Sequence, residues 1–463
     1  MKILLISPCP ENNQRRNSMA IPQLTLSLIA AMTPEEHEVE IIEEVNNETI
    51  DFDVDVDIVG ITLMTQTAIR GYEIANEFKK RDKVVIFGGI HATVMPHEAI
   101  RYADAVVIGE AEKGLWNQIL KDIKSHSLKE FYKLEKFPDL CDYIIPRRDL
   151  INTKAGKFGI SPIETGRGCP YGCDFCTVPS SFGKKQRFKS IDLIIKDIES
   201  ITDKVLFFLD DNIALNKKYA KELFTRMIPY NKYWVGQASI NIVKDKELMK
   251  LAYKSGCRGL LIGFESMTEK GIGQYKKTFS SFNENVEAIK TLQQNGIMTM
   301  ASFVFGLDID DKQVFENTWN FIKRAKPAFL QACVLTPYPG TEVFNRMKQE
   351  NRILTDDWRQ FDAKKVIVSP KNMSPEELQY GYTSIKDQTY SYQSIFSRAI
   401  PHIFSGLTEA ALYFSLNGGA RKWHKTGLTA EIFRNKPEKA VDFDVSKYVE
   451  PIKQKITSKT YVR

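Results

Sequence analysis

The run Gly166-Arg-Gly-Cys-Pro-Tyr-Gly-Cys-Asp-Phe-Cys-Thr177 brings three cysteines together, at positions 169, 173 and 176. Thiolates at this spacing can hold three irons of a 4Fe–4S cube, one iron each. The fourth iron then has no protein ligand, and an open coordination position distinguishes a catalytic metal site from a closed structural one. We therefore expect Cys169, Cys173 and Cys176 to bind an iron–sulfur cluster that keeps one iron open to a small molecule.

A zinc site, a disulfide framework and a ferredoxin cluster all fit these cysteines less well. A structural zinc site needs four ligands, usually in two short-spaced pairs, whereas the remaining cysteines are isolated: Cys9, Cys141, Cys257 and Cys333. A disulfide framework suits a short secreted chain rather than 463 residues with 7 cysteines. A ferredoxin supplies a fourth cysteine a few residues further on, and none follows Cys176 at that distance. We expect Cys257 and Cys333 to be core thiols.

The Cys-x3-Cys-x2-Cys spacing, with the aromatic Phe175 before the last cysteine, resembles the radical S-adenosylmethionine superfamily. The resemblance implies that the amino and carboxylate groups of S-adenosylmethionine bind the open iron. It also implies that one electron from the cluster releases a 5′-deoxyadenosyl radical, which abstracts hydrogen from an unactivated carbon. Such chemistry belongs to a cofactor, because no side chain can perform it. Phe175 either stacks on a ligand beside the cluster or packs in the core.

Residues 1 to about 130 alternate short apolar runs with helical patterns. The predicted strands are Lys2–Ser7, His37–Val45, Asp57–Leu63, Val84–Phe87 and Ala105–Ile108, and the predicted helices are Pro22–Met32 and Ile69–Lys79. Short apolar strands that alternate with helices favour a doubly wound parallel sheet, in which ligands bind beyond the carboxyl ends of the strands. We therefore predict an α/β protein whose residues 1–130 form a Rossmann-like domain.

Small and hydroxylated residues follow these strands, where they would let a large flat ligand approach the backbone. The candidates are Thr62, Thr65, Gly88, Gly89, His91, Gly109 and Glu110. The segments resemble the cobalamin-binding domain that precedes many radical S-adenosylmethionine enzymes, which implies cobalamin as a further cofactor. The chain lacks the Asp-x-His-x-x-Gly pattern that supplies a lower axial histidine in some of these domains. A loop histidine with a structural hydrogen bond therefore explains His91 as well as a cobalt contact does.

Residues 131–155 contain Pro138 and Pro146 and are predicted to form an irregular linker. From residue 156 to 345 strands and helices alternate again. The predicted strands are Gly159–Thr165, Val205–Leu209, Tyr233–Ala238, Gly259–Gly263, Thr299–Phe305 and Ala328–Val334. Polar residues recur just beyond the strands, which is typical of the active face of a β/α barrel. Six such units fit the partial (β/α)6 TIM-type barrel that the superfamily resemblance implies.

The resemblance also implies roles for the residues that follow these strands. Asp210, Asp211 and Asn212 occupy the place where the family binds the amino group of S-adenosylmethionine. Carboxylate and amide oxygens suit an ammonium group. A helix N-cap is the alternative for Asp211 or Asn212.

Three later strand ends complete the expected cofactor site. Gln237 and Ser239 are candidates for hydrogen bonds to the methionine carboxylate or the ribose, and Glu265 for a ribose hydroxyl. Gly306 would let the adenine lie against the backbone. For the polar residues, capping of the next helix is the alternative.

Residues 346–463 lack strand–helix alternation and are predicted to be a mainly helical extension, with a capped helix that starts at Ser374-Pro-Glu-Glu-Leu. The region is rich in aromatic residues, and Ile395–Leu416 is largely apolar, with interruptions at Pro401 and Gly406. It forms either part of the core or a lid over a lipophilic substrate or a membrane-surface face. The layout resembles the subgroup that contains hopanoid methylases and bacteriochlorophyll-pathway enzymes.

Charge and hydropathy restrict the location and the partners of the chain. The net charge of +6 does not indicate nucleic-acid binding. From Arg421 to Arg463 there are 11 Lys or Arg against 5 Asp or Glu, a basic tail that is either a solvated face or an anchor on an anionic surface. No apolar run reaches the roughly 18 residues of a membrane span, and Met1–Ser7 is too short for a signal peptide. We expect a cytoplasmic protein, with the C-terminal region as the candidate for peripheral membrane contact.

The resemblances together imply a cobalamin-dependent radical S-adenosylmethionine methylase. Its substrate would be a lipophilic molecule, such as a bacteriochlorophyllide or another tetrapyrrole, or a hopanoid or polyprenoid lipid, and its reductant an external one-electron donor such as flavodoxin or ferredoxin. The same cofactors also serve oxidative cyclisation, hydroxylation and carbon–carbon coupling. A methylthiotransferase acting on transfer RNA would need three further cysteines in the N-terminal domain, where this chain has Cys9 alone. A corrinoid-binding sensor or carrier would not need the three-cysteine motif.

Overall fold

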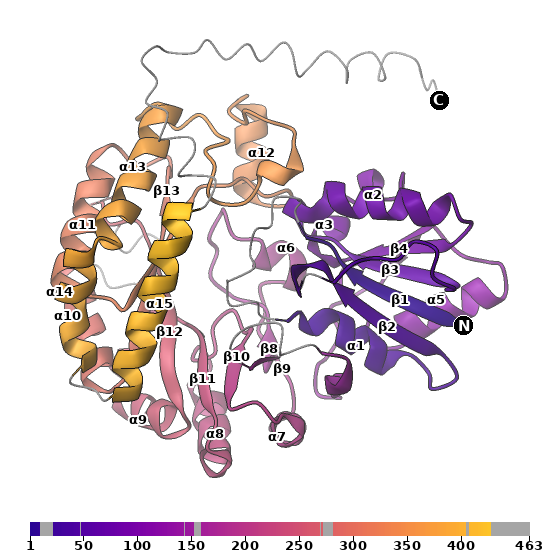
Figure 1. Cartoon of the computed structure of the whole chain (residues 1–463), viewed down its shortest axis with the longest axis horizontal. Helices are drawn as coiled ribbons and strands as arrows, with labels where there is room; N and C mark the ends of the chain where they lie inside the picture. The colour runs from indigo at the N-terminus through magenta and orange to yellow at the C-terminus, as the bar shows by residue number, and fades with distance from the viewer. Residues whose placement is uncertain are drawn as a thin grey trace. The chain divides into compact units, whose positions relative to one another are not determined.

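The computed structural model describes residues 1–9, 22–46, 48–142, 144–151, 159–268, 270–271, 281–403 and 407–426. Residues 1–421 form one compact unit, built on two six-stranded parallel sheets (Figure 1). Most of the predicted basic tail, residues 427–463, lies outside the described residues.

The first sheet has the strand order β2-β1-β3-β4-β5-β6. Its strands are β1 (Lys2–Ser7), β2 (Glu38–Glu43), β3 (Ile58–Thr62), β4 (Val84–Gly88), β5 (Ala105–Ile108) and β6 (Phe131–Lys133). The order reverses between β1 and β3, so this sheet has the topological switch point of a doubly wound fold. The predicted Rossmann-like fold is confirmed. Strand β6, at the start of the expected linker, was not predicted, because three residues are too few to show a strand pattern.

Both faces of this sheet are covered, as parallel sheets require. Along β1, Leu4 and Ile6 pack on one face with residues of α2 (Ala68–Lys79). Ile3 and Leu5 pack on the other face with residues of α1 (Leu24–Met32) and α5 (Leu115–Lys124). The unbroken apolar strands follow from this burial on both sides. Two short helices, α3 (Gly89–Val94) and α4 (Pro96–Ala99), follow β4.

The second sheet has the order β14-β13-β12-β11-β10-β7. Its strands are β7 (Ile160–Ile163), β10 (Val205–Phe208), β11 (Tyr233–Ala238), β12 (Cys257–Glu265), β13 (Met298–Phe305) and β14 (Phe329–Val334). The helices between them are α7 (Ile191–Ser200), α8 (Lys217–Met227), α9 (Lys246–Lys254), α10 (Phe282–Gln294) and α11 (Gln313–Ala325). Neighbouring strands follow one another in sequence, because right-handed crossovers place every helix on the same side. This sheet is the predicted partial barrel.

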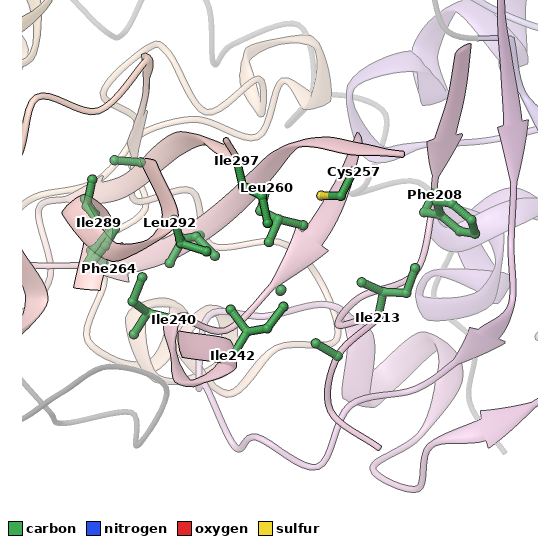
Figure 2. Close-up of a cluster of buried hydrophobic side chains, with 14 of the residues drawn as sticks. Phe208, Ile213, Ile240, Ile242, Cys257, Leu260, Phe264, Ile289, Leu292 and Ile297 are labelled. Atoms are coloured by element: carbon green, nitrogen blue, oxygen red, sulfur yellow. The ribbon is translucent and has the colours of Figure 1, made fainter. Parts of the chain in front are cut away.

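A large apolar core lies between these strands and their helices. Figure 2 shows part of it, with Leu260 and Phe264 of β12 and with Ile289 and Leu292 of α10. Cys257 is buried in the same core, and burial raises the pKa of its thiol. This position agrees with the prediction of a core thiol.

The C-terminal part is helical, as predicted: α12 (Glu342–Gln349), α13 (Pro375–Thr389), α14 (Tyr392–Ile403) and α15 (Leu407–Thr426). The predicted cap of α13 is present, since Glu377 donates its backbone N–H to Ser374 Oγ at 3.2 Å and Ser374 donates its own to Glu377 Oε2 at 2.9 Å. Pro401 lies inside α14 without ending it, although proline has no backbone N–H to donate to the preceding turn. Among the described residues, no helix is both long and apolar enough to cross a membrane.

Candidate active site

The three cysteines lie in a loop that is closed at its base by two short paired strands. These are β8 (Gly166–Arg167) and β9 (Arg187–Phe188), which run antiparallel. Gly168 has a φ of +92°, and a Cβ there would lie 2.4 Å from the Lys185 carbonyl oxygen, so glycine is required just before the first cysteine. The loop also contains the short helix α6 (Val178–Phe182).

Backbone hydrogen bonds help to hold the cysteines in the loop. Cys169 donates its backbone N–H to the Gly183 carbonyl at 3.4 Å, and Cys176 donates to the Cys173 carbonyl at 3.1 Å. Cys169 and Cys173 are buried, and Cys176 is half-buried. In the described part of the chain no three His, Cys, Asp or Glu side chains converge enough to hold a single metal ion. The three sulfur atoms of a 4Fe–4S site need not meet at one point, because each thiolate binds a different iron of the cube.

Helix α12 ties the cysteine loop to the end of the barrel. Val343 donates its backbone N–H to the Asp174 carbonyl at 3.1 Å, and Arg346 donates to the Asp174 carboxylate at 3.0 Å. Phe175 packs against an apolar cluster that includes Leu307 and Leu335. Core packing therefore accounts for this phenylalanine, and stacking on a cofactor stays a prediction.

Asp210 and Asp211 bind the backbone that leads into the cysteine loop. Asp210 accepts hydrogen bonds from the backbone N–H and the hydroxyl of Thr165, at 2.9 and 2.5 Å, and Asp211 accepts one from Gly168 N–H at 3.2 Å. Burial raises the pKa of Asp210 to about 7, against the opposing effect of the Thr165 hydrogen bonds. Because both oxygens of Asp210 already have partners, we propose that this residue positions the loop, in place of the expected contact with an amino group.

Asn212 is the best placed of this trio to bind a cofactor. Its side chain is buried, and its Oδ1 atom finds no hydrogen-bond partner among the described residues. Buried amide oxygens in proteins are nearly always satisfied. A bound ammonium group would supply the missing donor, so the structure fits the expected amino-group site at Asn212.

Glu110, a candidate cobalamin contact, forms ion pairs with two arginines. The Arg167 guanidinium donates to Glu110 Oε2 at 2.9 Å, and Arg187 donates to both Glu110 oxygens, at 3.0 and 2.5 Å. Glu110 follows β5 in the first domain, whereas Arg167 and Arg187 belong to the paired strands at the base of the cysteine loop. The carboxylate is turned toward these two cations, so it connects the two domains instead of facing the cofactor space.

Glu164 completes this ion network on the barrel side. It pairs with Arg167 Nε at 2.9 Å and with Lys189 Nζ at 2.6 Å. Burial tends to raise the pKa of Glu164, but Arg167 and Lys189 outweigh it and lower that pKa to about 2. Sequence analysis missed Glu164, Arg167, Arg187 and Lys189, although Glu164 and Arg167 stand within five residues of the first cysteine.

The carboxyl ends of β4 and β5 leave open space in front of two of the predicted glycines. A Cβ at Gly88 or Gly109 would meet no atom within 4 Å. Gly89 differs, because its φ is +92° and a Cβ there would lie 2.7 Å from Thr62 Oγ1. The open positions suit a large flat ligand, whereas Gly89 and Thr62 form the tight turn behind them. Met64, which sequence analysis missed, is 43% exposed after β3 and adds an apolar side chain at this edge.

His91 lies in α3 rather than in a loop, and its ring is fully buried. Its Nε2 lies 3.2 Å from the Tyr72 hydroxyl and its Nδ1 lies 3.4 Å from Thr65 Oγ1. The ring also packs edge-on against Trp358, and the Trp358 indole donates to Glu98 at 2.8 Å. Sequence analysis expected a structural hydrogen bond as one alternative for His91, and these contacts provide it for both His91 and Thr65.

One face of the barrel sheet is only half-buried. Along β13 burial alternates, so that Ala301, Phe303 and Phe305 face the core while Met300, Ser302 and Val304 lie on the half-buried face. The same alternation places further residues on this face, namely Gln237 of β11, Leu261 and Gly263 of β12 and Cys333 of β14. The carboxyl end of this face is the expected place for a cofactor and substrate. Ser239 follows β11 at its carboxyl end and is also half-buried.

Glu265 ends β12 in a strained conformation. Its φ is +64°, and the pairing with β13 shifts register between Gly263 and Glu265. A Cβ at Gly263 would lie 2.5 Å from Glu265 Oε1, so the carboxylate folds back over that glycine. Bulges and left-handed residues are concentrated at functional sites. The ribose contact of Glu265 stays a prediction.

Gly306 is explained by protein contacts. Its φ is +97°, and a Cβ would lie 2.6 Å from Leu378 of α13. Asp310 accepts hydrogen bonds from the backbone N–H groups of Gly306 and Leu307 and from the Ser266 hydroxyl, so it joins the loops after β12 and β13. The adenine contact of Gly306 stays a prediction, with Asp310 as a supporting residue that sequence analysis missed.

A cavity of about 920 Å³ is lined by the ends of α9, α10 and α11 and by Pro401. These helix ends precede β12, β13 and β14, so the cavity lies at the amino ends of the strands. Active sites of β/α barrels lie at the carboxyl ends. We therefore place the chemistry at the cysteine loop and not in this cavity.

Known proteins match each part of the chain. The Radical SAM superfamily matches residues 163–322, a B12 binding domain matches residues 19–116, and a domain of unknown function (DUF4070) matches residues 341–415. The bacteriochlorophyllide d C-12(1)-methyltransferase of Chlorobaculum tepidum is 30% identical over 408 residues, which cover 86% of this chain and 89% of that protein. The chain belongs to the cobalamin-binding radical S-adenosylmethionine family.

Other members of this family support the assignment. The bacteriochlorophyllide d C-8(2)-methyltransferase of Chlorobaculum tepidum is 29% identical over 83% of this chain and 89% of that protein. The hopanoid C-2 methylase of Rhodopseudomonas palustris is 24% identical over 73% of this chain and 67% of that protein. The solved structure of the radical S-adenosylmethionine methyltransferase TsrM from Kitasatospora setae, with cobalamin and a [4Fe-4S] cluster bound, shares the fold with a TM-score of 0.67 at 16% identity, over 91% of this chain and 99% of that chain.

Membership of this family confirms the predicted enzyme class and its cofactors, a 4Fe–4S cluster, S-adenosylmethionine and cobalamin. The described residues fit these groups. The three cysteines are held in one loop, Asn212 offers an unsatisfied buried oxygen, and Gly88 and Gly109 leave open space at the sheet edge.

Proposed function

We propose that this enzyme methylates an unactivated carbon of a lipophilic substrate, either a bacteriochlorophyllide-like tetrapyrrole or a hopanoid-like lipid. The observation that carries the proposal is the connection of the B12-type domain to the cysteine loop, through Glu110, Arg167 and Arg187. Methyl transfer to a carbon radical needs both cofactors near one another, and this ion network joins the segments that hold them. The substrates named for the bacteriochlorophyllide and hopanoid relatives support the substrate class.

The cofactors, when bound, supply the methyl group and the carbon-centred radical. The chain supplies their positions. Cys169, Cys173 and Cys176 hold the cluster, and Asn212 accepts a hydrogen bond from the amino group of S-adenosylmethionine. Gln237, Ser239 and Glu265 bind its carboxylate and ribose.

The half-buried face of the barrel sheet is where we place the substrate. Leu261, Met300 and Val304 give this face apolar side chains beside the polar Gln237. Such a mixture suits a large apolar molecule that is oriented by a few polar contacts. We further propose that an external one-electron donor, a flavodoxin or a ferredoxin, reduces the cluster. The protein would contact a membrane surface, where such a substrate resides.

The test is an anaerobic assay with reconstituted protein and methyl-labelled S-adenosylmethionine. With a bacteriochlorophyllide or a hopanoid as substrate, we expect a product that is heavier by one CH2 group and carries the label. A product without label, formed by protein with intact cluster and corrinoid absorbance, would contradict methylation and favour oxidative cyclisation, hydroxylation or carbon–carbon coupling.

Replacement of a cluster cysteine provides the first prediction. We expect Cys173→Ala to lose most of the iron and sulfide and all of the activity, because each thiolate holds its own iron. The matched control is Cys141→Ala, at an exposed cysteine outside the loop. Iron content and the optical spectrum measure the effect. Normal function of Cys173→Ala would favour the corrinoid sensor or carrier.

A further inference from the structure

Helix α14 presents four large apolar side chains to solvent. Its buried residues include Arg398 and His402, which are 1% and 2% exposed. Tyr392, Phe396, Ile400 and Ile403 are 64%, 61%, 49% and 49% exposed. A surface helix of a soluble protein normally turns its apolar stripe toward the core and its charges toward water. Helix α14 departs from this rule, because it buries Arg398 and His402 beside Ile395 and Ala399 and leaves four larger apolar side chains in water.

The orientation is fixed by the buried arginine. Arg398 donates to the Pro327 carbonyl at 2.9 Å and to the Thr389 carbonyl at 2.8 Å, and its Nη2 lies 3.1 Å from Asn417 Oδ1. Rotation of the helix about its axis would deprive a buried guanidinium of these acceptors, at a high cost in free energy. The exposure of the opposite side is therefore a stable feature of the fold.

The exposed residues form one continuous surface, which we call the α14 stripe: Tyr392, Phe396, Ile400 and Ile403. Their spacings of four, four and three residues place them on one side of the helix. Phe414 of α15 extends the stripe, with its ring centroid 5.8 Å from that of Phe396. The Arg421 guanidinium lies 3.8 Å from the centroid of the Tyr392 ring, so a cation borders the stripe at one end.

The end of α15 and the sequence beyond it indicate what covers the stripe. Arg421–Arg463 holds 11 Lys or Arg against 5 Asp or Glu, and from 427 to 463 no more than two large apolar residues are adjacent. Such a segment offers little apolar surface of its own to cover the stripe. A second copy of the chain would bring two basic segments together. An anionic bilayer accommodates both features, because acyl chains take up the apolar side chains and the headgroups attract the cations.

We propose that the α14 stripe rests on an anionic lipid bilayer, with its side chains at the boundary of headgroups and acyl chains. A bilayer is where a lipophilic substrate is found, so in this respect the inference rests on the proposed function. The exposure of the α14 stripe and the basic charge of Arg421–Arg463 do not depend on which substrate the enzyme uses.

The experiment is sedimentation of the full-length protein with vesicles of phosphatidylcholine and phosphatidylglycerol. We expect binding that weakens with salt and with removal of phosphatidylglycerol. The Ile400→Glu variant should bind about tenfold more weakly, since a charge replaces a side chain that inserts. Leu354→Glu is the matched control, because Leu354 is 49% exposed, as is Ile400, and lies outside the stripe. Equal melting temperatures of both variants verify the fold.

Three results would overturn the inference: no binding of the wild-type chain, equal loss in both variants, or a wild-type dimer in light scattering that Ile400→Glu dissociates. The proposed function is assayed separately, with detergent-solubilised substrate. Ile400→Glu should methylate that substrate normally, because the stripe lies outside the site. Loss of methylation in the wild type with retained vesicle binding would contradict the proposed function and leave the membrane surface standing.

Discussion

Gly88 and Glu110 lie at the ends of neighbouring strands and differ in what stands before them. Open space lies in front of Gly88, whereas the Glu110 carboxylate is occupied by Arg167 and Arg187. The glycines at strand ends are likewise of two kinds in this chain. Some leave room for a ligand, and others, such as Gly89 and Gly306, are required by a left-handed φ and a close neighbour.

Gly88→Ala tests the first cause. The φ of Gly88 is −139°, an extended conformation open to any residue, and the added methyl group meets no protein atom within 4 Å. We expect an unchanged melting temperature and weaker binding of hydroxocobalamin, by about tenfold, because the methyl group enters the space of the ligand. Spectroscopic titration of the corrinoid measures the affinity.

Gly419→Ala is the matched control, because Gly419 also has open space before it and lies in α15. It should bind the corrinoid as the wild type does. Full affinity in Gly88→Ala would move the corrinoid away from the end of β4.

Helix α14 shows how one element can serve two environments. Its inner side carries Arg398 and His402, and the ring of His402 stacks on Tyr413 of α15 with centroids 4.8 Å apart. Burial lowers the pKa of His402 to about 4, and the nearby Arg398 adds to this shift. The helix therefore packs on the protein with a neutral histidine.

This pKa makes folding stability depend on pH. Between about 6.5 and about 4 the unfolded chain binds a proton at this histidine that the folded protein does not bind. The stabilisation is thus complete above about pH 6.5 and is lost as the pH falls toward 4, by up to about 3 kcal/mol.

We expect His402→Phe to reduce the loss of stability across this range, because phenylalanine keeps the stacking on Tyr413 and does not titrate. Urea unfolding at several pH values gives the comparison with the wild type. His97→Phe, at an exposed histidine, is the matched substitution and should follow the wild-type profile. A parallel fall in wild type and His402→Phe would refute the assignment.

Across the molecule, the two domains are joined by buried charges. The side chains of Glu110, Arg167 and Arg187 are only 4%, 9% and 11% exposed. Removal of one partner from a buried ion pair costs about 3–5 kcal/mol, because the other charge is left without compensation. The junction between the B12-type domain and the cysteine loop therefore depends on the Glu110 carboxylate and its two arginine partners.

Glu110→Gln should lower the free energy of unfolding by at least about 2 kcal/mol and weaken the retention of both cofactors. Denaturant unfolding, iron content and corrinoid absorbance report the three effects. Glu77→Gln is the control, since Glu77 pairs with Lys80 and Arg81 on the surface, where such pairs contribute little. An effect of the same size in both variants would argue against a special role of the junction.

The spacing and pattern of residues along the chain predicted an iron–sulfur site and both sheets, and the resemblance to known families implied S-adenosylmethionine and cobalamin. Three cysteines within one short loop and strands with an apolar pattern are local features, and local features indicate which thiols can share a cluster and which segments form strands. The same is true of the capped start of α13, where Ser374 and Glu377 are three residues apart.

The roles of Glu110, His91, Asp210 and Gly306 depended on folding instead. Glu110 meets Arg167 and Arg187 across 57 and 77 residues of sequence, and Asp210 meets Thr165 across 45. Whether a strand-end carboxylate faces a cofactor or a guanidinium depends on what the tertiary fold places opposite it. The residue type at a strand end does not predict that partner, because the partner is distant in the sequence. For the same reason the sequence of α14 does not show which side of the helix faces outward, since the burial of Arg398 decides this in the folded protein.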